Sequence, residues 1–186
     1  MSKYAVTNPA TGESLAKYPQ ISDADLAEAI TRADAATRGW GRSASLAQRS
    51  ELVRRIGDLH SERRDELANA LVSEMGKPLA QAYGEIDFAA DIYRYHAEIA
   101  AEELADQPIG LRAGTGTAVI RQAPLGVILG VMPWNFPFYQ VARFAGPNLA
   151  IGNSVLLKPA SQCPRTGELI AKIYLDAGAP AGAFEM

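Results

Sequence analysis

The sequence predicts an α/β fold in which a helical amino-terminal region precedes the first strands and helices of a parallel sheet. Apolar residues recur at helical spacing over roughly the first hundred positions. Two apolar runs, residues 127–132 and 155–157, do not alternate with polar residues, which is typical of parallel strands buried on both faces. A helical stretch follows each run. The order βαβα therefore predicts the beginning of a doubly wound sheet.

The amino-terminal region begins with a predicted β-hairpin, because residues 4–7 and 14–18 flank a turn-forming segment around Pro9 and Gly12. Ser22 and Asp25 have the spacing of a capping box, and Ser45 and Gln48 open a second helical stretch. In the first helix the residues expected at helical spacing are Leu26, Ala29, Ile30, Ala33 and Trp40. The predicted helices cover about residues 23–38, 45–75 with a break near Ser61, and 78–104.

The pattern changes after Pro108. Residues 113–116 read as a loop, and residues 117–122 are rich in β-forming side chains, so this stretch is predicted to be a strand-rich arm. Beyond it the predicted order is a strand over 127–132, a helix over 138–151, a strand over 155–157, a helix over 165–177 and a further strand near Phe184. A parallel sheet cut there would expose unpaired strand edges.

Composition excludes several classes of function. The net charge is −3 and the pI is near 5.4, with basic residues scattered among acidic ones, so neither nucleic acid nor a membrane is an expected partner. No apolar stretch approaches the roughly 20 residues of a membrane helix. One cysteine excludes an intrachain disulfide, and two distant histidines give no zinc spacing, so no metal site is predicted. The expectation is a soluble cytoplasmic protein.

Both parallel strands end in polar, backbone-constrained turns. The first turn is Pro133-Trp134-Asn135-Phe136-Pro137, and the second is Lys158-Pro159-Ala160-Ser161. Open α/β sheets bind cofactors at the carboxyl ends of such strands. From the residues alone, the favoured interpretation of Asn135 is a cap of the following helix, and Lys158 could be a solvated lysine at a strand end.

These motifs, together with Pro124-Leu125-Gly126-Val127, Gly146-Pro147 and Gly152-Asn153, resemble the aldehyde dehydrogenase superfamily, in particular its succinate-semialdehyde branch. The resemblance covers the whole chain and is specific, because several motifs occur in the expected order. It implies an aldehyde dehydrogenase-like fold with a partial Rossmann-type sheet. It also implies oxidation of a small-molecule aldehyde to a carboxylic acid with NAD(P)+, and the branch makes succinate semialdehyde the expected substrate.

The resemblance also assigns residues. Asn135 is the expected donor to the oxyanion that forms when a cysteine thiolate attacks the aldehyde. The expected cofactor-binding residues are Val131, Met132, Pro133, Trp134, Asn135, Lys158, Pro159, Ala160 and Ser161. Many NAD-preferring members have Glu where this chain has Ser161, and Glu repels a 2′-phosphate. A neutral hydroxyl beside the Lys158 ammonium predicts that NADP+ is accepted and preferred over NAD+.

Arg143 lies one helical turn beyond Tyr139, so the two share a helix face. In the succinate-semialdehyde branch, an arginine at the matching position holds the far carboxylate of the substrate, which suits the permanent charge of guanidinium. Phe136 and Tyr139 are expected to line the aldehyde tunnel. From the residues alone, a surface arginine and ordinary aromatic packing remain open.

By the resemblance, residues 1–105 are the hairpin and helices of the cofactor-binding domain, 106–124 an oligomerisation arm, and 125–186 the incomplete first βαβα of the dinucleotide-binding sheet. The nucleophilic cysteine, the general-base glutamate and the catalytic domain would follow Met186, and Cys163 is assigned no catalytic role. The chain alone is therefore expected to be inactive, and its full-length form a homo-oligomer. The alternative is a non-catalytic remnant or interaction module that keeps the fold and the arm.

Overall fold

A computed structural model describes residues 4–186, so only residues 1–3 of the predicted segment 1–105 lie outside it. At its centre is a parallel sheet with the strand order β5-β6-β7, formed by β5 (Val127–Val131), β6 (Ser154–Lys158) and β7 (Phe184–Glu185). The helix α5 (Pro137–Ile151) connects β5 to β6, and α6 (Pro164–Asp176) connects β6 to β7. The predicted βαβα order and the strand near Phe184 are confirmed.

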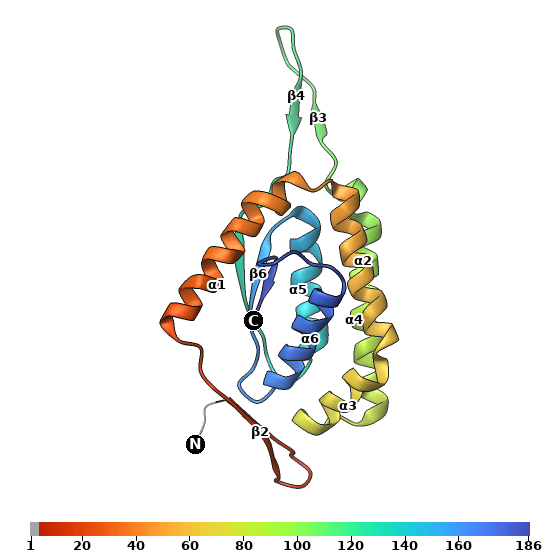
Figure 1. Cartoon of the computed structure of the whole chain (residues 1–186). Helices are drawn as coiled ribbons and strands as arrows, with labels where there is room; N and C mark the ends of the chain where they lie inside the picture. The colour runs from red at the N-terminus through yellow and green to blue at the C-terminus, as the bar shows by residue number, and fades with distance from the viewer. Residues whose placement is uncertain (1–3) are drawn as a thin grey trace.

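The elements form layers around this sheet. Figure 1 shows α1 (Asp23–Ala36) on one face of the sheet and α5 and α6 on the other. The remaining helices pack outside α5 and α6; they are α2 (Leu46–Glu62), α3 (Arg64–Met75) and α4 (Leu79–Glu103). Within residues 4–186, no helix combines the length and the apolar character that crossing a bilayer requires.

Two hairpins project from opposite ends of the layered body (Figure 1). The predicted amino-terminal hairpin is confirmed as β1 (Tyr4–Thr7) and β2 (Ser14–Tyr18). The second hairpin pairs β3 (Gln107–Ile109) with β4 (Ala118–Ile120), so the predicted strand-rich arm has a first strand that the sequence pattern did not indicate. Pro108 lies at the centre of β3 and disfavours a strand in the local sequence pattern. The strand forms because it pairs with β4.

The helix ends follow the predicted capping chemistry. The Ser22 hydroxyl accepts a hydrogen bond from the backbone N–H of Asp25 at 3.1 Å, and Ser45 and Gln48 form both halves of a capping box. The break predicted near Ser61 falls at Arg63, between α2 and α3. After α1 the chain continues as a π-helical turn, Thr37–Gly41, which the apolar spacing did not predict.

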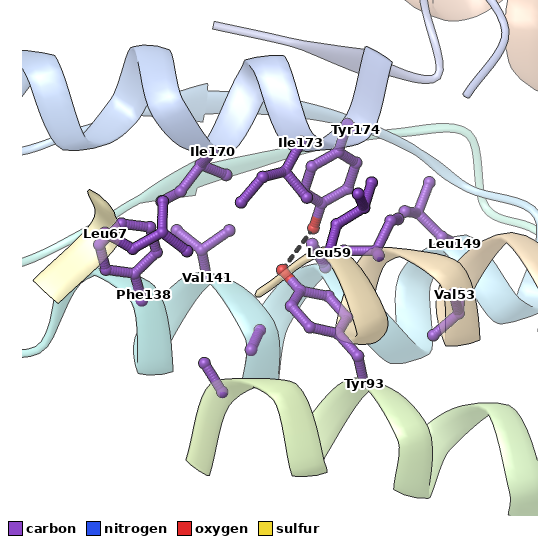
Figure 2. Close-up of a cluster of buried hydrophobic side chains, with 14 of the residues drawn as sticks. Val53, Leu59, Leu67, Tyr93, Phe138, Val141, Leu149, Ile170, Ile173 and Tyr174 are labelled. Atoms are coloured by element: carbon purple, nitrogen blue, oxygen red, sulfur yellow. Dashed lines mark hydrogen bonds between the residues drawn. The ribbon is translucent and has the colours of Figure 1, made fainter. Parts of the chain in front are cut away.

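The core lies between the sheet-covering helices and the outer helices. Figure 2 shows buried side chains from both sides of this interface, with Val141 of α5 and Tyr174 of α6 on one side and Leu59 of α2 and Tyr93 of α4 on the other. Gly130 of β5 allows α5 to approach closely, because a Cβ there would lie 2.5 Å from the Phe144 ring. Burial of this apolar surface supplies the main driving force for folding.

One burial prediction is wrong. The sequence pattern predicts that β5 is buried on both faces, but Leu129 and Val131 are each 63% exposed. Both lie on the face away from α5, which α1 covers only in part (Figure 1). In α1 the alanines Ala29 and Ala33 are buried, whereas Leu26 and Ile30 remain exposed. The buried face of α1 is therefore made of alanines, and Leu26 and Ile30 lie outside it.

Candidate functional site

The two predicted turns meet at one edge of the sheet. Val131 at the end of β5 pairs with Lys158 at the end of β6, and the N–H of Met132 donates to the Lys158 carbonyl oxygen at 3.1 Å. Further along, the Cys163 thiol lies 4.0 Å from the carbonyl oxygen of Trp134. The parallel register brings the two segments together, as the sequence predicted.

The first turn presents Trp134, Asn135 and Phe136 to solvent. The N-cap of α5 is Phe136, so Asn135 precedes the capping position and the capping interpretation of Asn135 does not hold. Instead, the backbone N–H groups of Phe138 and Tyr139 donate to Oε1 of Glu85, at 2.9 and 3.4 Å. A carboxylate from α4 thus caps the helix that follows the turn.

Lys77, in the connection between α3 and α4, forms an ion pair with Glu85 inside the protein. The two side chains are 5% and 0% exposed. The Lys77 ammonium also donates to the carbonyl oxygen of Asn135 at 2.9 Å and lies 3.7 Å from the centre of the Phe136 ring. The buried Lys77 ammonium therefore anchors the backbone of the first turn to the protein interior.

The second turn is held in a similar way. The Lys158 ammonium donates to the carbonyl oxygen of Pro159 at 2.8 Å, and the Ser161 carbonyl oxygen accepts a hydrogen bond from Ala5 of the hairpin at 3.4 Å. The carboxylate of Glu74 accepts the backbone N–H groups of Arg165 and Thr166, both at 2.8 Å, and thereby caps α6. Pro159, Ala160 and Ser161 are half-buried.

Arg143 lies on the exposed side of α5 with Tyr139, as their spacing predicted. Its guanidinium Nη1 donates to the Tyr139 hydroxyl at 3.2 Å. The Tyr139 ring stacks on Phe88 of α4 at 5.2 Å and meets the Phe136 ring edge-on at 6.0 Å. These residues bring a cation and three aromatic rings together beside the first turn.

Cys163 cannot serve as a nucleophile where it stands. Its side chain is fully buried, and burial, reinforced by the nearby Glu74 and Glu85 carboxylates, raises the pKa of its thiol to about 12. A thiolate, the reactive form, is therefore negligible near neutral pH. Among residues 4–186, no three His, Cys, Asp or Glu side chains are grouped so as to hold a metal ion.

Sequence reasoning missed the residues that support the turns from other helices, namely Glu74, Lys77, Glu85 and Phe88. One signal was available: Glu85 falls in the apolar stripe of α4, between Ala82 and Ala89, where a charged residue needs a buried partner. Nothing in the pattern identified that partner as Lys77.

The sheet order, the crossover helices and the paired turns at the carboxyl edge define the beginning of a Rossmann-type α/β domain. The profile of the aldehyde dehydrogenase family matches residues 1–186. The chain belongs to the aldehyde dehydrogenase family.

Its relatives are longer than this chain. It is 42% identical over 181 residues to the NADP+ succinate-semialdehyde dehydrogenase of Deinococcus radiodurans, covering 97% of this chain and 37% of that protein. It is 40% identical to the glutarate-semialdehyde dehydrogenase of Pseudomonas putida, with the same coverage. The crystal structure of succinic semialdehyde dehydrogenase from Streptococcus pyogenes with NADP+ superposes with a TM-score of 0.93 at 35% identity, over 98% of this chain and 40% of that chain.

Proposed function

We propose that this chain is the amino-terminal, cofactor-binding part of an NADP+-dependent aldehyde dehydrogenase that oxidises succinate semialdehyde to succinate. The observation that carries the proposal is the meeting of the Asn135 turn and the Lys158 turn at one sheet edge. The names of its relatives support the substrate and the cofactor, since several are NADP+ succinate-semialdehyde dehydrogenases. Glutarate semialdehyde, named for another relative, is a one-carbon-longer substrate of the same class.

The residues at this sheet edge suit NADP+, whose ribose carries a 2′-phosphate. The second turn offers an ammonium group at Lys158 and a neutral hydroxyl at Ser161, without a carboxylate between them. This donor set attracts a ribose 2′-phosphate rather than repelling it. Val131, Met132, Pro133 and Trp134 of the first strand end, with Pro159 and Ala160 of the second, would form the walls of the same site. When bound, NADP+ supplies the hydride acceptor for the reaction.

The chain's own contribution to the chemistry is orientation and charge stabilisation. The Asn135 side-chain amide would donate to the substrate oxygen as it gains negative charge, an interaction that strengthens in the transition state. Arg143 would bind the far carboxylate of the substrate, with Phe136 and Tyr139 beside the aliphatic part. In this arrangement the aldehyde group of the substrate would face Asn135, and its carboxylate would be bound by Arg143 further along α5.

The isolated 186-residue chain is proposed to lack turnover, because its only cysteine, Cys163, is buried and protonated. The chain spans about 37–40% of the length of the relatives that it matches. The rest of the catalytic machinery is proposed to come from the part of the enzyme that corresponds to their remaining length. In the same proposal, the projecting segment 106–124 serves oligomerisation, residues 1–105 and 125–186 form the cofactor-binding part, and the complete enzyme acts in the cytoplasm as a homo-oligomer.

A chimaera tests this function. Residues 1–186 replace the matching part of the Deinococcus radiodurans relative, and NADPH formation is followed with succinate semialdehyde. We expect turnover by the chimaera and none by the isolated chain. Asn135→Ala in the chimaera should lower kcat by about 100-fold or more. Asn148→Ala on α5 is the matched control, because its side chain donates to the Phe144 carbonyl oxygen and accepts from the Asn153 side-chain amide, both away from the turns. A folded chimaera without turnover, or equal kcat in both variants, would refute the proposal.

A further inference from the structure

The segment from Glu74 to Glu85, which joins α3 to α4, contacts the first turn and the starts of both helices that follow the turns. Glu74, in the last turn of α3, caps α6 after the second turn, and Glu85, in α4, caps α5 after the first. Lys77 lies between these carboxylates in sequence and reaches the first turn itself. Helix N-termini usually receive a cap from their own N-cap residue, but Phe136 and Cys163 occupy these positions without a side-chain cap.

We propose that the Lys77–Glu85 pair is a positioning device for Asn135. The pair fixes the turn at two points, since Lys77 binds the Asn135 carbonyl oxygen and Glu85 binds the N–H of Phe138, three residues later. Between these two points the backbone has little freedom. The Asn135 side chain remains exposed, so the tether holds the backbone of Asn135 while leaving its amide for a ligand.

Burial makes this tether specific. A buried ammonium group needs nearly all of its donors satisfied, and Lys77 has the Glu85 carboxylate, the Asn135 carbonyl oxygen and the face of the Phe136 ring around it. If the turn moved away, Lys77 would lose two of these three partners in a site that water barely reaches. The free-energy cost of leaving a buried ammonium group without these partners opposes movement of the turn. The buried ion pair thus keeps the first turn ordered at the sheet edge.

This inference rests on the proposed function only for its consequence in catalysis. An oxyanion donor accelerates a reaction to the extent that it is held in place before the charge develops. A displacement of about 1 Å can cost about 100-fold in rate. Lys77 and Glu85 would therefore govern kcat through Asn135, with little effect on how the cofactor binds at the second turn.

The primary test is nuclear magnetic resonance on the 186-residue chain. In the double variant K77M/E85Q both charges are removed together, so no unpaired buried charge remains, and the new side-chain amide oxygen can still accept from the N–H of Phe138. The turn therefore loses the bond to the Asn135 carbonyl oxygen and the contact of the Lys77 ammonium with the Phe136 ring. We expect lower heteronuclear NOE values for the Asn135 side-chain and backbone amides and for the Trp134 amide. Unchanged values in the folded double variant would overturn the proposal.

The matched control breaks another ion pair that α4 makes. Arg64 of α3 binds Asp87 of α4 through two hydrogen bonds, at 2.6 and 2.8 Å, on the exposed side. R64M/D87N should leave the Asn135 amides unchanged, and an equal loss of order there would show that the effect is not specific to Lys77 and Glu85, which would contradict the proposal. If K77M/E85Q does not fold, K77Q/E85Q replaces it, because both charges are again removed together and the two side-chain amides can hydrogen-bond each other.

The catalytic consequence is read in the chimaera. K77M/E85Q should lower kcat by about tenfold or more while the KM for NADP+ stays within about threefold. Lys77→Arg, which keeps a charged donor, should recover part of kcat. An unchanged kcat would refute the positioning role. If the parent chimaera shows no turnover at all, the proposed function fails, and the NOE measurement on the isolated chain still decides whether the pair orders Asn135.

Discussion

The phenol oxygens of Tyr93 and Tyr174 lie 2.6 Å apart in the core and join α4 to α6 (Figure 2). Both side chains are buried, and burial raises the pKa of each phenol, so both are neutral at any ordinary pH. One hydroxyl donates to the other. This bond connects the outer helical layer to the helix that follows the second turn.

Changing either tyrosine to phenylalanine should therefore leave one buried hydroxyl without its partner. We expect Tyr93→Phe and Tyr174→Phe each to lower the free energy of unfolding by about 1–2 kcal/mol. The double variant should lose less than the sum, because no hydroxyl remains to be satisfied. Urea unfolding of the four proteins measures this, and strictly additive losses would contradict the account.

The buried His60 should make the stability of the fold depend on pH. Its ring is fully buried, Nδ1 donates to the Ile56 carbonyl oxygen at 2.8 Å, and Nε2 has no hydrogen-bond partner among residues 4–186. Burial lowers the pKa of His60 from 6.5 to about 4. The unfolded chain therefore binds the extra proton first, and stability falls as the pH drops from about 6.5 toward 4.

The loss over this range should reach about 3 kcal/mol, since each pKa unit corresponds to about 1.4 kcal/mol. Urea unfolding at several pH values, with the parent chain and His60→Phe, measures it. The difference between the two proteins removes contributions common to both, including that of Glu74, whose pKa is raised by burial. A difference that does not change between pH 7 and pH 4.5 would show that His60 is not held neutral.

Arg143 should determine selectivity for aldehydes that carry a second, carboxylate end. In the chimaera, Arg143→Ala should raise the KM for succinate semialdehyde by about 10- to 100-fold, because a charged hydrogen bond to the far carboxylate is lost. The KM for butanal, which has no carboxylate, should change little. Lys172 of α6, an exposed cation that pairs with Asp176, provides the matched control as Lys172→Ala. Equal effects of Arg143→Ala on both aldehydes would reject the assignment.

Ser161 predicts cofactor choice. Ser161→Glu places a carboxylate beside the proposed 2′-phosphate, so the KM for NADP+ in the chimaera should rise by about tenfold or more through charge repulsion. The KM for NAD+ should fall or stay constant, because a carboxylate can accept from a ribose hydroxyl. Steady-state kinetics with both cofactors test this. A parent preference for NAD+ that the variant leaves unchanged would exclude Ser161 as the determinant.

The parts of this structure that sequence could predict depend on local chemistry. Ser45 and Gln48 lie three residues apart and form their capping box wherever the helix begins. The two strand ends were predictable for a similar reason, because a parallel register brings successive carboxyl ends to one edge, as Val131 and Lys158 show. The spacing of Tyr139 and Arg143 likewise fixed their shared helix face.

The parts that sequence could not predict depend on distant partners. Lys77 binds Asn135 across 58 positions, and Glu85 caps Phe138 across 53, so no local pattern contains either contact. Exposure of Leu129 has the same origin, since it depends on what covers the far face of β5 rather than on the apolar run itself. A run without alternation identifies the strand, but its burial depends on its neighbours in space.

The central claim is that the two turns form one cofactor site, and titration of the isolated 186-residue chain with NADP+ tests it most directly. We expect the amide resonances of Trp134, Asn135, Lys158 and Ser161 to shift together along one saturating curve, with the resonances of the β3–β4 hairpin unchanged as an internal control. Shifts confined to one turn, or curves for the two turns that give different dissociation constants, would contradict it.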